Sequence, residues 1–219
     1  MRRPMLAVIL IAAVSGCRDV IPFQDITTIT GYQLNGALTT ASGVPIEGAD
    51  VSLVYNYEFL GDVPSDTVQV VVTKPVSFVD VAVYTPTYDL VRQLFFDNRN
   101  EGPVPHFYWN GRDRNNNLVP SGKYLIRYVI DTTIVKYTPW IVEAHTTAAT
   151  DVGGKFTISG TQLPIGDVFD IYDNTNTYLG TYRVAQTINL RFTRLGQIST
   201  YYDVGLLSNK ITTRTFILQ

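Results

Sequence analysis

The chain has 219 residues, of which 45% are hydrophobic, 16% charged and 12% aromatic, and its formal net charge is −2. This hydrophobic fraction with so few charges excludes a disordered chain. The near-neutral charge argues against a nucleic-acid-binding protein, which needs a basic face. The 14 tyrosines and the abundant threonines favour β-strands.

Residues 1–16 predict an export signal. Arg2 and Arg3 supply positive charge, and an apolar run covers residues 6–14. The run is far too short for the roughly 20 residues of a membrane-spanning helix, but it fits the apolar region of a secretory signal peptide. The segment Val14-Ser15-Gly16-Cys17 that follows resembles a bacterial lipobox, in which the cysteine is lipidated and the peptide before it is removed. The alternative is an ordinary signal peptide with an incidental Cys17.

Cys17 is the only cysteine of the chain, so an exported form has no internal disulfide and depends on its cores alone. The lipobox resemblance implies that palmitate-type lipid on Cys17 anchors the protein in a membrane of the bacterial cell envelope. Residues 17–28 then form the lipidated cysteine and a tether. Arg18 and Asp19 do not distinguish the membranes, and we expect the outer membrane.

From residue 29 onward we find no amphipathic helix pattern, and short runs alternate apolar with polar residues. The alternating apolar residues are Val51, Leu53 and Tyr55; Val68, Val70 and Val72; Val79, Val81 and Val83; Tyr124, Ile126, Tyr128 and Ile130; and Ile188, Leu190 and Phe192. Turn signals such as Asn35-Gly36, Ser42-Gly43 and Gly153-Gly154 separate strands of this kind. The pattern predicts an all-β fold, and the length fits two β-sandwiches.

Two separated segments carry one family resemblance. Residues 43–53 include Gly48 and Ala49, and residues 150–158 include Asp151, Gly154 and Phe156. Together they are similar to the two halves of a carboxypeptidase regulatory-like domain, which is a transthyretin-type β-sandwich. The gap between the halves is nearly as long as a whole domain.

The gap contains a second resemblance, to the end of a FlgD-type Ig-like domain. The motif covers residues 109–124, and the matching residues are Trp109, Gly111, Asp113, Pro120, Gly122 and Tyr124. The whole match covers residues 67–131 and includes an upstream hairpin over residues 79–94 with a turn at residues 85–89. Asn110 replaces the family's usual aspartate, and Asn116 stands where a turn glycine is expected. Asparagine tolerates a positive φ, so the turn can form. The resemblance implies that Trp109, which we expect at the end of a strand, packs in a core beneath a hairpin that Tyr124 closes.

These resemblances predict a nested arrangement. A carboxypeptidase regulatory-like sandwich is formed by residues 29–62 with 141–219, and a FlgD-type Ig-like sandwich of residues 63–140 is inserted into one of its loops. The alternative is two sequential sandwiches that divide near residue 140.

The sequence indicates no catalytic, cofactor-binding or metal-binding site. It has no Gly-x-Ser-x-Gly elbow, and its two histidines, His106 and His145, are too few for a zinc site. Residues 113–117 resemble the start of a calcium loop, but Leu118 and Tyr124 occupy the positions that require Gly and Glu. A structural turn explains these residues better than a calcium site.

Two functions follow as hypotheses. The first is a non-enzymatic, membrane-anchored envelope lipoprotein with a structural, adhesive or protein-interaction module. The alternative is a carbohydrate-binding lipoprotein of a polysaccharide-uptake system, in which aromatic side chains stack on a glycan. The candidate aromatic residues are Tyr55, Tyr57, Phe59, Tyr201 and Tyr202.

Overall fold

The computed structural model describes residues 31–61, 69–143, 146–173, 175 and 177–219. The predicted signal peptide, Cys17, the tether, Val68 and His145 lie outside the described residues. The described chain is all-β, as predicted, with one 3₁₀ turn, η1 (Gly160–Gln162). The strands are β1 (Tyr32–Thr39), β2 (Asp50–Gly61), β3 (Val71–Tyr84), β4 (Leu90–Pro103), β5 (Gly122–Ile130), β6 (Thr133–Val142), β7 (Ala148–Ala149), β8 (Lys155–Ile158), β9 (Val168–Tyr172), β10 (Tyr178–Arg194), β11 (Gln197–Gly205) and β12 (Lys210–Ile217). Among the described residues, no helix is long and apolar enough to cross a lipid bilayer.

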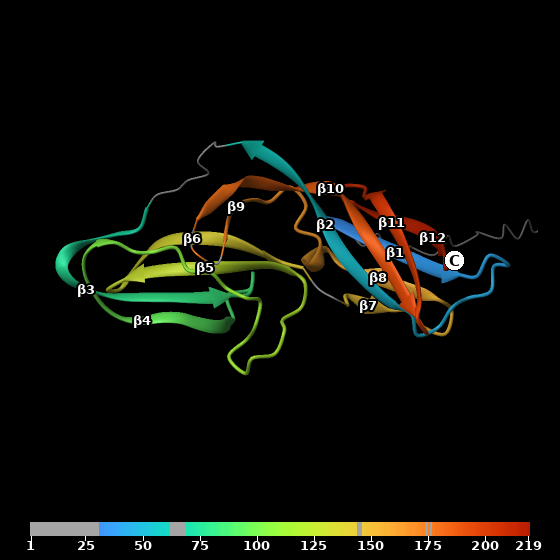
Figure 1. The fold of residues 1–219 in the computed structure, drawn as a ribbon, viewed down its shortest axis with the longest axis horizontal. Coiled ribbons are helices and arrows are strands. Elements are labelled where there is room, and N and C mark those ends of the chain that lie inside the picture. The colour runs from blue at the N-terminus through green and yellow to red at the C-terminus, as the bar shows by residue number, and fades with distance from the viewer. Residues whose placement is uncertain (1–30, 62–68, 144–145, 174, 176) are drawn as a thin grey trace, which may run out of the picture.

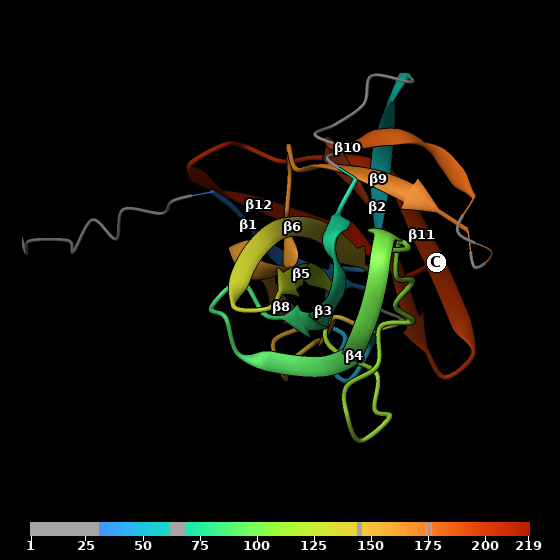
Figure 2. The ribbon, with the colours of Figure 1, turned by 90° about the vertical axis from the view of Figure 1, so that its left-hand side faces the viewer.

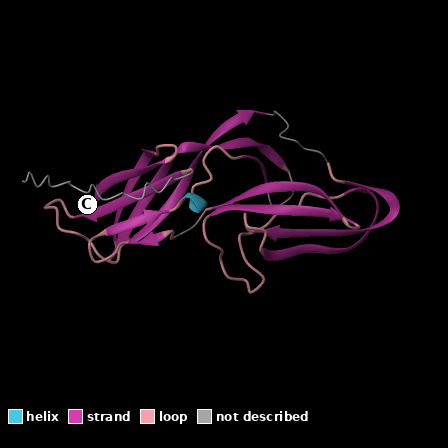
Figure 3. Cartoon of the chain, turned by 180° about the vertical axis from the view of Figure 1, so that it is seen from behind, coloured by secondary structure: helices cyan, strands magenta, loops and turns pink. Residues whose placement is uncertain are grey.

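The strands form three sheets (Figures 1 and 3). The first has the order β12-β1-β8, and the second has the order β11-β10-β2-β7 with β9 paired to β10. The third has the order β4-β3-β5-β6 and lies at the opposite end of the elongated molecule. The pair β1–β12 is parallel, and the other strand pairs are antiparallel. Seen end-on, the third sheet is strongly curved (Figure 2).

The first two sheets enclose one core. The alternating residues of β2 and β10 point into it, so that Val51, Leu53 and Leu190 are fully buried, as the period-two pattern predicts. Phe192 and Phe216 lie at its centre with ring centroids 5.0 Å apart. Because successive strand residues face opposite sides, the polar residues between them remain at the surface.

The third sheet has a separate core. Val79, Val81 and Val83 of β3 are fully buried together with Ile126 of β5, again as the alternation predicts. Within the described part of the chain, β3–β6 pair only with one another, although they follow β2 and precede β7 in sequence. The predicted division into two folding units stays a prediction, and β6 itself runs past residue 140 to Val142.

The two halves of the first motif lie side by side. The Gly48 amide donates to the Thr150 carbonyl oxygen at 2.9 Å, and the Ala49 amide donates to Thr150 Oγ1 at 2.9 Å. The Leu38 amide donates to the Gly154 carbonyl oxygen at 2.8 Å. Gly154 has φ +69, and a Cβ there would lie 2.4 Å from the Leu38 carbonyl oxygen, so this close approach requires glycine.

Candidate functional site

The segment between β4 and β5 covers the open side of the third sheet. The expectation that Trp109 lies at the end of a strand is wrong, because β4 ends at Pro103 and residues 104–110 are not in a strand. The Val104 amide still donates to the Val70 carbonyl oxygen at 2.8 Å, but Pro105 lacks an N–H, so the ladder of hydrogen bonds does not continue through it. Residues 104–110 instead form an irregular segment, and Trp109 at its end packs in the core of the third sheet.

Trp109 is 2% exposed, as expected for a core residue. Its Nε1 donates to the Arg112 carbonyl oxygen at 2.8 Å, and its ring meets the Tyr124 ring edge-to-face with centroids 5.0 Å apart. The Tyr124 hydroxyl donates to the Pro120 carbonyl oxygen at 2.9 Å. Gly111, near this tryptophan in sequence, has φ +70. Trp109, Pro120 and Tyr124 of the second motif are therefore connected by ring contacts and hydrogen bonds.

Asp113 closes a turn. Its Oδ1 accepts hydrogen bonds from the amides of Asn115 and Asn117, each at 2.8 Å, and Asn116 has φ +67. The hydrogen bond from the Asn117 amide lowers the pKa of the Asp113 carboxyl. Within the described residues, no three His, Cys, Asp or Glu side chains are grouped so that they could hold a metal ion.

The aromatic residues considered for a glycan platform do not form one surface. Tyr55 is 3% exposed, and its hydroxyl donates to the Gln162 carbonyl oxygen. Phe59 packs against Tyr182 on β10, while Tyr202 is exposed on β11 beyond β10. Tyr55, Phe59 and Tyr202 therefore do not form one glycan-binding surface.

A different aromatic site lies where the third sheet meets the second. We call this hollow, of about 410 Å³, the junction groove. Its walls come from β2, from the segment before β5, from the end of β6 and from β9. Its principal lining side chains are Tyr57, Tyr108, Trp140, Glu143, Phe169 and Tyr172.

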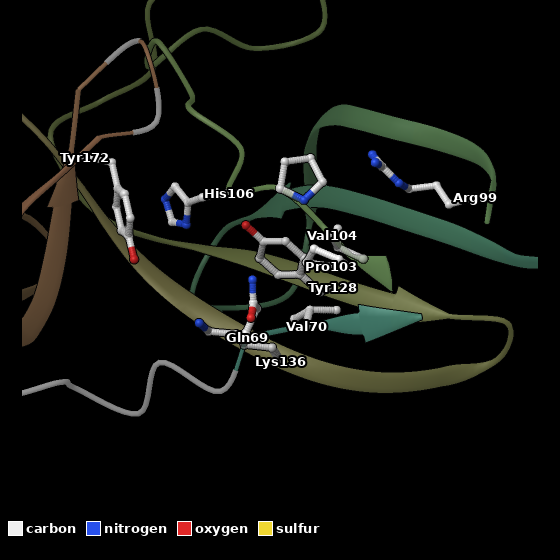
Figure 4. Close-up of a pocket in the computed structure, with 10 residues that line it drawn as sticks. Gln69, Val70, Arg99, Pro103, Val104, His106, Tyr128, Lys136 and Tyr172 are labelled. Carbon is white, nitrogen blue, oxygen red and sulfur yellow. The ribbon is translucent and has the colours of Figure 1, made fainter. Parts of the chain in front are cut away.

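A second hollow, of about 480 Å³, shares Tyr172 with the junction groove and is lined also by His106, Tyr128 and Lys136 (Figure 4). The His106 ring stacks on the Tyr172 ring with centroids 3.7 Å apart, and Trp140 lies 6.4 Å away. Among the described residues, no atom hydrogen-bonds to the buried Nε2 of His106. Burial, with a smaller contribution from the charge of Lys136, lowers the pKa of His106 to about 4, so the imidazole is neutral at pH 7.

Sequence reasoning did not identify the junction groove. Tyr108, Trp140 and Tyr172 belong to three distant segments, and none of them forms a motif with its sequence neighbours. Their proximity depends on how two sheets pack, which an alternation pattern does not encode. The run Phe107-Tyr108-Trp109 was the available signal, since three adjacent aromatic residues cannot all face one core.

No protein-family model, curated protein or solved structure matches this chain. The lipobox resemblance and the two domain resemblances therefore stay predictions that rest on the motif residues.

Proposed function

We propose that this chain is a non-enzymatic lipoprotein of the bacterial cell envelope that binds a protein partner. Lipid on Cys17 anchors it in the outer membrane, residues 17–28 tether it, and the β-sheets present the binding surface. The junction groove is the observation that carries the proposal. Tyr108 is 49% exposed there, next to Trp140, and aromatic side chains in a concave surface are characteristic of the energetically dominant part of protein interfaces.

The polar groups of the groove support binding rather than catalysis. The Tyr57 hydroxyl donates to Glu143 Oε1 at 2.7 Å, and Thr181 Oγ1 donates to Asp170 Oδ1 at 2.6 Å. Burial and the nearby Glu143 raise the pKa of Tyr57, so the phenol stays protonated and is not a nucleophile. These contacts fix the carboxylates as hydrogen-bond acceptors on the groove wall.

Two measurements test this proposal. Replacement of Cys17 by Ser, with the signal intact, should move the protein from the membrane fraction to the soluble fraction of the cell envelope, whereas the parent chain stays with membranes. A variant that remains membrane-bound contradicts the lipid anchor.

A photo-crosslinking amino acid at position 108 should give one dominant protein adduct in living cells. The same amino acid at position 195, where Leu195 is 95% exposed, is the matched control and should give none. Equal labelling from both positions, or no adduct from position 108, contradicts a partner at the groove.

A further inference from the structure

The aromatic walls of the junction groove form a corner. The rings of Tyr108 and Trp140 have centroids 5.6 Å apart and planes inclined at 78°. Tyr57 and Phe169 close the side toward the second sheet, with centroids 5.5 Å apart. An aromatic face carries partial negative charge, so a corner of such rings attracts a cation that is wide enough to touch both walls.

The charged side chains that line the groove are acidic. Glu143 and Asp170 are both lining residues, and the described lining includes no Lys, Arg or His. The basic residues Arg99 and Lys136 line the other hollow, which shares Tyr172, and Lys136 also lines a hollow with Asp170, so Glu143 is the carboxylate that the groove offers to a ligand. Glu143 is exposed, and Tyr57 fixes one of its oxygens at 2.7 Å. A carboxylate has about four acceptor positions, so Glu143 retains capacity for a further donor.

The shape and charge of the groove match a guanidinium group better than an ammonium group or a neutral sugar. A guanidinium is planar, stacks on aromatic rings, is weakly hydrated and donates two parallel hydrogen bonds to one carboxylate. An ammonium is more strongly hydrated and loses more on entering an apolar corner. A neutral sugar would stack on the rings and donate hydroxyl hydrogen bonds to a carboxylate, but it would gain no ion pairing with Glu143.

We infer that the junction groove receives an arginine side chain of the protein partner, stacked in the corner of Tyr108 and Trp140 and paired with Glu143. This inference rests on the proposed function and specifies the chemistry of the contact. A hollow of about 410 Å³ is large enough for such a side chain.

The full chain in detergent micelles is titrated with acetyl-Gly-Arg-Gly-amide, and the shift of the Trp140 indole N–H signal is followed by NMR. The same peptide with citrulline in place of arginine is the matched neutral probe, because citrulline keeps the shape and loses the charge. We expect the arginine peptide to bind at least about threefold more tightly than the citrulline peptide, a difference typical of one charge pair. Added salt should reduce this difference.

Two variants locate the contact. Glu143→Gln keeps an acceptor for Tyr57, and it should weaken arginine-peptide binding by at least about threefold and remove the preference over citrulline. Tyr108→Ala should weaken the binding of both peptides. Glu58→Gln is the matched control, since the Glu58 side chain is 54% exposed on β2 and is not a lining residue. An unchanged circular dichroism spectrum shows that each variant is folded.

Equal binding of the arginine and citrulline peptides overturns the inference, as does the absence of binding or an unchanged affinity in Glu143→Gln. Binding of maltotriose instead of the arginine peptide overturns it in favour of a glycan site. A position-108 crosslink to a protein, together with no arginine-peptide binding, retains the proposed function and rejects the arginine. Peptide binding without any crosslink rejects the proposed function itself.

Discussion

Several tight turns of this chain are closed by one side-chain contact. A side-chain oxygen of Thr40, Thr85, Asp113 or Asp151 accepts a hydrogen bond from the amide four residues later, at 2.8–3.1 Å. The residue before that amide has a positive φ in each turn, which is the geometry of a three-residue hairpin loop. The residues with positive φ are Gly43, Tyr88, Asn116 and Gly154.

The sequence predicts all four turns, but the residue type indicates a positive φ in only three of them. Gly43 and Gly154 are glycines in predicted turns, and Asn116 is the residue type that tolerates positive φ best after glycine. Tyr88 has φ +66 without such a signal. Its conformation is required by the hydrogen bonds of Thr85 and Asp89, and its ring packs on Tyr137, so tertiary contacts override its own preference.

Trp109→Ala should destabilise the third sheet by about 3–5 kcal/mol, because a large buried ring leaves a cavity. A loss of that size is comparable to the whole stability of a small domain without disulfides. We expect β3–β6 to unfold in this variant while the core of Val51, Leu53 and Leu190 stays intact. Hydrogen exchange of the two groups of strands measures this.

The neighbouring residue supplies the control for Trp109. Tyr108 is 49% exposed and contacts Trp140, so Tyr108→Ala should destabilise the protein by only about 0.5–1.5 kcal/mol, the size of one aromatic pair. If Trp109→Ala leaves the exchange of β3 and β5 at the parent rate, Trp109 does not hold this core together.

At the scale of elements, alternation predicts the strands that have one buried face. It therefore identifies segments of β2, β3, β5 and β10, whose inward residues are apolar. Alternation does not identify β4, whose start is expected only from the hairpin of the FlgD-type resemblance, because β4 is an edge strand with exposed or half-buried residues on both faces. Without a buried face, a strand carries no period-two pattern, and neither the length of β4 nor the parallel pairing of β1 with β12 is encoded locally.

Gly36 lies where β1 packs closely against β8. It pairs with Phe156 between β1 and β8, and the Phe156 ring lies directly over it. A Cβ at Gly36 would come within 2.0 Å of that ring. This contact explains why a glycine in the interior of β1 faces the motif phenylalanine.

Gly36→Ala should destabilise the first sheet by about 1–3 kcal/mol, because the ring has to leave its position in the core. Gly205→Ala is the matched control. Gly205 also lies in a strand, has no positive φ and has open space around its Cβ position, so less than about 0.5 kcal/mol is expected. Urea unfolding of both variants gives the two values, and an equal effect would show that Phe156 does not constrain this position.

At the scale of the whole molecule, a few contacts connect the third sheet to the other two. Lys123 Nζ lies 2.8 Å from Asp167 Oδ2, and Tyr57 donates to Glu143. A Cβ at Gly122 would lie 2.6 Å from the Thr161 carbonyl oxygen, so β5 begins in direct contact with η1. These contacts are single residues far apart in sequence, which is why the motifs predicted each sheet's core but not the groove between the sheets.

In the nested arrangement, the sandwich of residues 29–62 and 141–219 folds without the inserted segment. Replacement of residues 66–139 by a flexible Gly/Ser linker should leave a remainder that folds cooperatively, because the buried residues of the core formed by β1, β2 and β7–β12 all lie outside 66–139, and Ile141 of β6, which packs against that core, is retained. The hydrogen bond from Tyr57 to Glu143 places the second half of β2 near the end of β6. A linker of about 10 residues, which spans up to about 35 Å when extended, reaches between them.

Circular dichroism of this shortened chain should show strand content and one unfolding transition. A sequential division near residue 140 predicts the opposite, since the cut would then remove strands from a shared core and leave the remainder unfolded.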